Sequence, residues 1–183
     1  MGYAGGTARN PTYQHLGDHT ETVQIDYDPA RISYSQLLAV FWSSHNPTYP
    51  PWSKQYQSII FYHDDDQKKL ALETKEHQEA LAGGKIFTEI VPATEFYLAE
   101  DYHQKYYLMG VPELMKEFSA KYPDTRAFIG STVAARVNGY LGGHGNIESL
   151  TSLIDILGLS PDGKKNLLKI ATHRAGRIVC STQ

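Results

Sequence analysis

The sequence predicts an α/β or α+β domain with a mixed β-sheet flanked by helices, followed by a helical C-terminal extension. Three observations lead to this fold class. Strand-like and helix-like runs alternate along the first half of the chain, which is typical of domains that mix the two. Beyond Gly110 only helical spacing recurs. The 183 residues, 41% of them hydrophobic, suffice for one domain with an appendage. We therefore expect a first domain at residues 1–109 and the extension at residues 110–183.

The first elements are predicted from turn-forming residues and from the spacing of apolar residues. Residues 1–20 have the composition of a loop, because glycines and a turn dipeptide interrupt them. The run from Glu21 to Tyr27 alternates between apolar and polar residues, which predicts a half-buried strand. A helix is expected next, since Ser33 and Gln36 have the spacing of a capping box, and it should end near His45.

The middle of the chain continues the alternation of strands and helices. Gln55 to Tyr62 is apolar and rich in β-branched residues at its centre, which predicts a central strand. Asp64 to Leu81 reads as a charged helix that Gly83 ends. Ile86 to Val91 alternates again and predicts another strand. The tyrosine-rich segment from Glu95 to Leu108 is compatible with a helix or an ordered loop.

The C-terminal region has only helical spacing and glycine-rich connections. Pro161 suits the first position of its last helix, because proline is tolerated there. We expect helices at Pro112 to Lys121, Thr125 to Val137, Ile147 to Leu157 and from Pro161 onward, a flexible loop at Asn138 to Gly145, and frayed residues at 174–183.

Composition excludes several classes of protein. The net charge of −3 and the pI of about 6.2 give no nucleic-acid footprint. No apolar run approaches the roughly 20 residues that span a bilayer, and the first residues lack the basic start and apolar core of a signal peptide. One cysteine, Cys180, allows no internal disulfide. We expect a soluble, intracellular protein, cytoplasmic by default, with no membrane or nucleic-acid partner.

Five short blocks in the first part of the chain carry a family resemblance. They are Gly-Tyr-Ala-Gly-Gly-Thr from Gly2, Asn-Pro-Thr-Tyr ending at Tyr13, His-Thr-Glu ending at Glu21, Val-Phe-Trp with His-Asn-Pro-Thr, and Ala-Glu-Asp-Tyr-His-Gln-Lys-Tyr ending at Tyr106. In this order they resemble the peptide methionine sulfoxide reductase A family. The resemblance implies that family's fold and an oxidoreductase, a peptide-methionine (S)-S-oxide reductase, that repairs oxidised methionine under oxidative stress. It also implies no bound cofactor, a substrate that is free or in proteins, and thiols drawn from thioredoxin or, in vitro, dithiothreitol.

Reduction of a sulfoxide needs a thiolate that attacks sulfur and a donor that stabilises and protonates the oxygen. Carried over motif by motif, the family's oxygen-holding tyrosines fall on Tyr13 and Tyr56. Its proton donor falls on Glu21, which would act best as a neutral acid in a poorly solvated pocket. The resemblance assigns the building of the substrate site to Glu100, Asp101, His103 and Tyr106.

The chain also departs from the family pattern. The family's nucleophilic cysteine lies in a Gly-Cys-Phe-Trp segment upstream of the position of Gly2, and this chain starts after that point. Leu141 stands where the family's usual tail has a resolving cysteine, and the shortened loop before Gln55 lacks an expected aspartate. Cys180 is only a remote candidate nucleophile, although Arg174 and Arg177 would favour its thiolate if they lay close to it.

Three interpretations stay open at this stage. The chain is a truncated form of a reductase, a non-catalytic relative that binds a sulfoxide, or an interaction module whose helical region does the work. Tyr13, Tyr56 and Glu21 also have a structural interpretation, as core-edge tyrosines and a solvated strand residue. His15, His19 and His103 match no tight metal-ligand spacing, so no metal site is expected.

Overall fold

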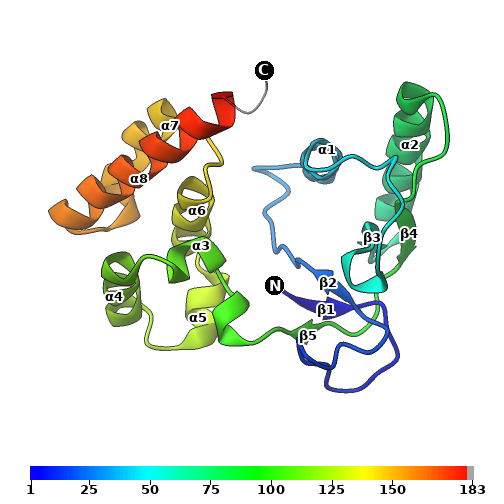
Figure 1. The fold of residues 1–183 in the computed structure, drawn as a ribbon, viewed down its shortest axis with the longest axis horizontal. Helices are drawn as coiled ribbons and strands as arrows, with labels where there is room; N and C mark the ends of the chain where they lie inside the picture. The colour runs from blue at the N-terminus through cyan, green and yellow to red at the C-terminus, as the bar shows by residue number, and fades with distance from the viewer. Residues whose placement is uncertain (181–183) are drawn as a thin grey trace. The chain divides into compact units, whose positions relative to one another are not determined.

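The computed structural model describes residues 1–180, with side chains described as far as Arg174. The chain divides into two compact units, Met1–Glu100 and Asp101–Gln183 (Figure 1). The described strands all lie in the first unit, and the second is helical. The mixed α and β class with a helical C-terminal region is thus confirmed, and the domain boundary at residues 109 and 110 stays a prediction. No helix among the described residues combines the length and apolarity needed to cross a membrane.

The first unit contains a small antiparallel sheet with β1 (Gly2–Ala4) at its centre. β2 (Thr20–Thr22) pairs on one side of β1 and β5 (Tyr97–Leu98) on the other. Tyr3 faces Glu21 across one pair of strands, and its side chain is only 1% exposed. This register places Glu21 directly beside the start of the chain.

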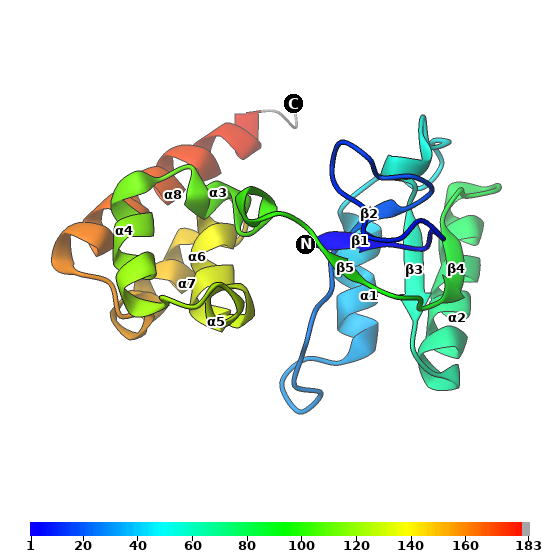
Figure 2. The same cartoon turned by 90° about the horizontal axis from the view of Figure 1, so that it is seen from below.

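A second sheet of two parallel strands completes the first unit. β3 (Ile59–Tyr62) pairs with β4 (Glu89–Pro92), and α2 (Asp65–Ala82) forms the crossover between them. α2 and α1 (Tyr34–Ser43) can be followed beside these strands in Figure 2. The core between these elements is small and consists of Leu38, Trp42, Ile60, Ala71 and Ile86.

The helix ends of the first unit form as the sequence predicts. At the start of α1, Gln36 N donates to Ser33 Oγ at 3.2 Å and Ser33 N donates to Gln36 Oε1 at 2.8 Å, so the capping box is confirmed. Asp64 caps α2 by accepting from Gln67 N at 2.7 Å. Gly83 ends α2 in the left-handed region with φ of 65°, where glycine pays no steric cost.

The strand expected from Glu21 to Tyr27 is wrong beyond Thr22. Among the strands that the structure describes, β2 pairs with β1 alone, and this pairing ends at Gly2 opposite Thr22. Val23 and Ile25 are 65% and 57% exposed. The apolar and polar residues alternate from Glu21 to Tyr27, but this alternation does not form a strand without a neighbouring strand to bond to.

The other predicted strands are shorter than expected. The segment Lys54–Tyr56 forms a 3₁₀ turn, so β3 begins only at Ile59. The expected strand from Ile86 to Val91 is found at Glu89–Pro92, with Ile86 buried in the core instead. The segment from Glu95 to Leu108, for which helix and loop were both open, forms β5, a 3₁₀ turn and a short helix.

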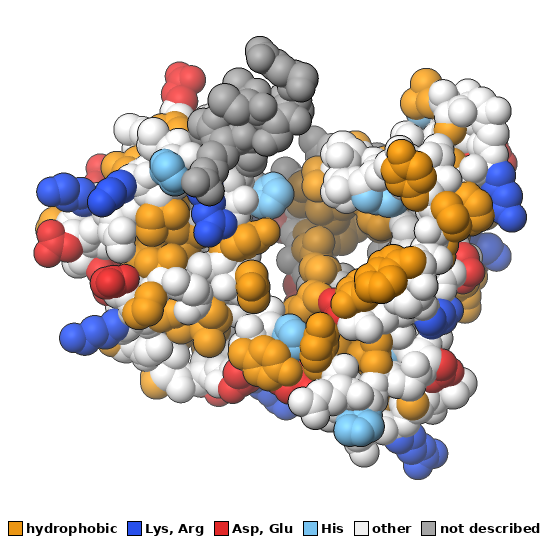
Figure 3. All heavy atoms as spheres, in the orientation of Figure 1, with side chains coloured by type: hydrophobic (Ala, Val, Ile, Leu, Met, Phe, Trp, Pro, Cys, Tyr) orange, Lys and Arg blue, Asp and Glu red, His pale blue; other side chains and the backbone are white. Residues whose placement is uncertain are grey.

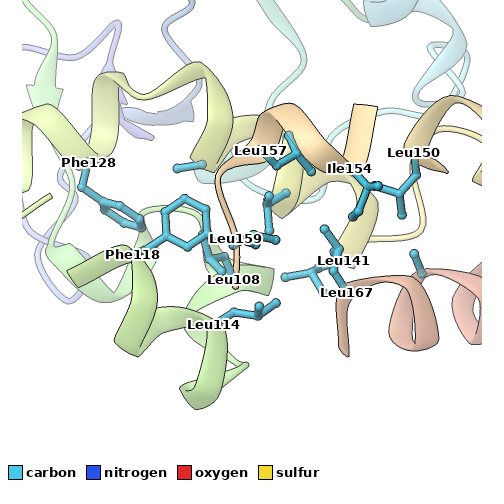
Figure 4. Close-up of a cluster of buried hydrophobic side chains, with 13 residues drawn as sticks. Leu108, Leu114, Phe118, Phe128, Leu141, Leu150, Ile154, Leu157, Leu159 and Leu167 are labelled. Atoms are coloured by element: carbon cyan, nitrogen blue, oxygen red, sulfur yellow. The ribbon is translucent and has the colours of Figure 1, made fainter. Parts of the chain in front are cut away.

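The second unit is a set of helices around one continuous core of 13 buried residues (Figure 4). Its largest side chains include Phe118, Phe128 and a group of leucines. The helices are α3 (Tyr106–Met109), α4 (Pro112–Lys121), α5 (Thr125–Gly130), α6 (Thr132–Leu141), α7 (Ile147–Leu153) and α8 (Pro161–Cys180). A 3₁₀ turn at Ile154–Leu157 follows α7, and another at Asp101–His103 precedes α3.

Three expectations for this unit need correction. The helix expected from Thr125 to Val137 is broken at Ser131, whose backbone is extended and whose Oγ accepts from Ala134 N at 3.1 Å as the cap of α6. The loop was expected to begin at Asn138, but α6 continues to Leu141, which is 1% exposed. Gly139 lies inside α6, where glycine costs about 1 kcal/mol relative to alanine. The burial of Val137 and Leu141 on the same helix offsets that cost. The fraying expected at residues 174–183 is wrong as far as Cys180, because α8 continues to that residue, and its part at residues 181–183 lies outside the described residues.

Candidate functional site

The loop between β1 and β2 is closed by a single carboxylate. Asp18 accepts hydrogen bonds from Thr7 N at 2.8 Å, Thr7 Oγ1 at 2.9 Å and Ala8 N at 3.1 Å. The backbone N–H groups of Thr7 and Ala8 are the main reason why the pKa of Asp18 falls to about 2. A Cβ on Gly6 would lie 2.5 Å from Asp18 Oδ1 and 2.7 Å from His19 N, so the close approach requires glycine.

His19 fastens the same loop from inside. The imidazole is 1% exposed; Nδ1 accepts from Gly6 N at 3.2 Å, and Nε2 donates to Ala8 O at 2.8 Å, which fixes the tautomer by its partners. Both ring nitrogens of His19 are thereby engaged with the backbone. Among the residues that the structure describes, no group of three or more His, Cys, Asp or Glu side chains is arranged to hold a metal ion.

Glu100 joins the end of the first unit to its beginning. Its Oε2 accepts from the hydroxyl group of Tyr3 at 2.7 Å, and its Oε1 accepts from Tyr13 N at 3.0 Å. The carboxylate therefore ties the Asn-Pro-Thr-Tyr segment to the central strand. Sequence reasoning named Glu100 through the family resemblance, and the structure shows that it contacts the backbone of Tyr13.

The structure brings Tyr13, Tyr56 and Glu21 together. A hydrogen bond with the side chain of Tyr13 raises the pKa of Tyr56, as do partial desolvation and the charges of Tyr13 and Glu21. Tyr13 and Tyr56 are 41% and 44% exposed, so both residues lie at an accessible surface. The phenols and the carboxyl group provide donors and a proton carrier for a polar ligand.

The 3₁₀ turn that carries Tyr56 is fastened to β2. Gln55 Nε2 donates to Glu21 Oε1 at 2.6 Å, and Thr20 Oγ1 donates to Lys54 O at 2.9 Å. Sequence reasoning did not name Gln55 as a site residue, although it directly precedes Tyr56 in the chain. It occupies one oxygen of Glu21 and orients the carboxyl group beside the tyrosines.

An indole also lies at this site. The ring of Trp52 stacks on that of Tyr56, with centroids 5.3 Å apart and an interplanar angle of 10°. The sequence contained Trp52 but gave no signal that placed it.

The remaining predicted site residues belong to the second unit. Asp101 and His103 lie in the 3₁₀ turn before α3, and Tyr106 begins that helix with 69% of its side chain exposed. Tyr106 borders a cavity of about 470 Å³ whose lining includes Tyr107 and Arg174. Their part in a substrate site stays a prediction.

Two further positions were considered for thiols, Leu141 and Cys180. Leu141 is part of the helical core. The side chains of Cys180 and of neighbouring Arg177 lie outside the described residues.

Comparison with known proteins agrees with this organisation. Residues 1–124 match the family described as peptide methionine sulfoxide reductase. Residues 128–166 match the helical domain of selenoprotein methionine sulfoxide reductase A. The second match falls within the helical unit, and the first contains all of the predicted site residues other than Cys180.

Individual relatives and a solved structure are also similar. A peptide methionine sulfoxide reductase of Drosophila melanogaster is 44% identical over 88% of this chain and 65% of its own length. One from Methanosarcina mazei is 47% identical over 58% of this chain and 56% of its own length. The chain thus spans less than two thirds of the length of these relatives.

The crystal structure of Mxr1 from Saccharomyces cerevisiae in reduced form is similar, with a TM-score of 0.56 at 32% identity, over 61% of this chain and 70% of that one. A family match over residues 1–124 covers more than half of the 183 residues. The chain belongs to the peptide methionine sulfoxide reductase family.

Proposed function

We propose that this chain acts as a peptide-methionine (S)-S-oxide reductase in the repair of oxidised methionine, and that it binds the sulfoxide oxygen between Tyr13, Tyr56 and Glu21. The observation that carries the proposal is the hydrogen-bonded pair of phenols beside a carboxyl group at an exposed surface. Glu100 supports the proposal because it holds the backbone of Tyr13 in place.

The chemistry of this cluster suits a sulfoxide. The S–O bond leaves negative charge on oxygen, and O–H donors aimed at it stabilise that charge further as the bond breaks. The pKa of an ordinary tyrosine, about 10, already leaves its hydroxyl group protonated at neutral pH. The pKa of Tyr56 is raised further by its hydrogen bond with Tyr13, so Tyr56 is a donor there. Glu21 is the proposed proton donor to the departing oxygen. For Asp101, His103 and Tyr106, which belong to the second unit, a role in substrate binding is proposed from the family resemblance alone.

The reduction requires two thiols for each sulfoxide. A thiolate bonds to the sulfoxide sulfur while the oxygen takes up protons and leaves. A second thiol then forms a disulfide with the first, giving the thioether, one disulfide and water. We propose thioredoxin as the source of reducing thiols, with dithiothreitol as a substitute in vitro and no bound cofactor. A thiol-dependent reaction suits a reducing compartment such as the cytoplasm.

A second candidate function is binding of sulfoxides without reduction. One sequence observation favours it: the chain contains a single cysteine, Cys180. Cys180 is the only nucleophile within this sequence that the reductase mechanism can use. The two functions share the oxygen site and differ in the thiol.

Two measurements test these proposals. Isothermal titration calorimetry with N-acetyl-methionine-S-sulfoxide should show binding that Tyr13→Phe or Glu21→Gln weakens about tenfold, the equivalent of about 1.4 kcal/mol for a lost hydrogen bond. Tyr49→Phe is the matched control, because Tyr49 is a 73% exposed tyrosine of the same unit. Equal affinity in all four chains would eliminate the proposed oxygen site.

A reductase assay with dithiothreitol then separates the two functions. Activity in the unaltered chain that disappears in Cys180→Ser would identify the tail thiol as the nucleophile. Binding without turnover in either chain would leave the non-catalytic function.

A further inference from the structure

Trp52 presents a large apolar surface next to the oxygen site. Its side chain is 84% exposed, and one face of the indole is covered by Tyr56. Trp42 is only 6% exposed in the core of the same unit. Exposed tryptophan beside a polar cluster is characteristic of binding surfaces, where indole rings contribute disproportionately to affinity.

The segment that carries Trp52 is fixed at both ends. Before it, Phe87 N donates to Pro47 O at 2.8 Å. After it, Thr20 Oγ1 donates to Lys54 O at 2.9 Å. Two prolines directly precede Trp52 and restrict the backbone further. A ligand that uses this indole therefore has little chain entropy to remove on binding.

Trp52, Tyr56 and Tyr13 form a continuous aromatic row that leads to Glu21. The stacking of Trp52 on Tyr56 makes the first link and the hydrogen bond between the two tyrosines makes the second. Every member of the row is at least 41% exposed. Figure 3 shows hydrophobic side chains at the molecular surface on the face that it presents. Contiguous exposed apolar side chains next to polar groups mark a ligand-binding surface.

We propose that Trp52 determines specificity for polypeptide substrates by contacting the residue next to the oxidised methionine. This inference rests on the proposed function, because Tyr13, Tyr56 and Glu21 hold the sulfoxide. The ring centroids of Trp52 and Tyr56 are 5.3 Å apart. An extended chain advances about 3.3 to 3.6 Å per residue, so the residue next to a methionine sulfoxide held at Tyr56 is within reach of the indole. The substrate class is a flexible protein segment with an apolar or aromatic residue beside the sulfoxide.

Calorimetry on the full chain tests the role of Trp52. The probes are N-acetyl-methionine-S-sulfoxide amide, and two acetylated, amidated peptides, Gly-Met(S-oxide)-Phe-Gly and Gly-Met(S-oxide)-Gly-Gly. Thioether versions of both peptides report the sulfoxide preference. Trp52→Ala is compared with Val40→Ala, which removes another exposed apolar side chain of this unit.

We expect Trp52→Ala to weaken binding of the phenylalanine peptide about tenfold and to leave the affinity for the small amide unchanged. Val40→Ala should change neither. If Trp52→Ala binds every probe as tightly as the unaltered chain does, and both still prefer sulfoxide to thioether, the role of Trp52 is overturned and the proposed function is not. An unaltered chain that binds thioether and sulfoxide probes equally would overturn the proposed function, and the role of Trp52 with it.

Discussion

The two units of this chain are stabilised in different ways. The helical unit buries 13 residues in one cluster. The first unit has two smaller clusters, five residues between its helices and parallel strands and three around β1. In compensation, its loops are held by side chains that bond to backbone groups, among them Asp18, His19 and Glu100.

The comparison shows where a site for a polar ligand can be built. A large apolar core resists change because each removed methylene group leaves a cavity. Loops held by individual polar contacts place donors and acceptors at an accessible surface. Tyr13 lies on such a loop, Tyr56 lies in a 3₁₀ turn and Glu21 in the short strand β2, and none of the three belongs to a core cluster.

The largest effect should come from the helical core. Phe118 is 2% exposed, so Phe118→Ala should lower the free energy of unfolding by about 3 to 5 kcal/mol. Both tryptophans lie in the first unit. The transition followed by helical circular dichroism should therefore shift, while that followed by tryptophan emission should not. Equal shifts with both probes would show that the two units unfold together, which would contradict their separate stabilisation. Ile156→Ala, at a 66% exposed position, is the control and should shift neither.

A smaller effect is expected in the loop of the first unit. Gly6→Ala should lower stability by about 1 to 3 kcal/mol through overpacking, because the new Cβ meets Asp18 Oδ1 at 2.5 Å and backbone atoms within 2.8 Å. Tryptophan emission during urea unfolding measures this change. Gly84→Ala has open space around the new Cβ and should be close to neutral. Similar midpoints for the two variants would contradict the tight approach seen at Gly6.

The smallest effect concerns the protonation of Asp18. Its pKa is lowered from 3.8 to about 2 by the hydrogen bonds from Thr7 and Ala8. A lowered pKa means that the carboxylate stabilises the fold fully above about pH 4, and that this contribution is lost as the pH falls through about 2. The amide resonances of Thr7 and Ala8 should titrate with a midpoint near pH 2 in nuclear magnetic resonance spectra. In Asp18→Asn this titration should be absent; a midpoint near pH 4 in the unaltered chain would argue against the hydrogen bonds.

Local signals in the sequence predicted the helices well. The capping box of Ser33 and Gln36 and the terminator Gly83 act within a few residues, so the sequence contains all their partners. The strand expected at Glu21 to Tyr27 failed because a strand depends on a distant partner of matching length. Ser131 breaks an expected helix because its hydroxyl group caps the next one, and the periodicity of the apolar residues did not show this.

The candidate site also contains residues that local motifs predict and residues that only the fold brings together. Tyr13, Tyr56 and Glu21 were predicted from short motifs, and the structure places them together, although their roles stay predictions. Gln55 was missed because its contact with Glu21 spans 34 residues and depends on the fold. The stacking of Trp52 on Tyr56 follows from the course of a proline-containing loop, for which the sequence has no periodic signal.

The bonds of Glu100 also set an order of assembly. They connect positions that are 97 and 87 residues apart in the chain, to Tyr3 and to Tyr13 respectively. Bringing Glu100 to these residues lowers the entropy of the chain before the contacts can stabilise the fold. During synthesis Tyr13 leaves the ribosome long before Glu100 does. The proposed sulfoxide site is therefore expected to mature only after translation has passed the end of the first unit. A nascent chain that stalls earlier would contain Tyr13 without the carboxylate that holds its backbone.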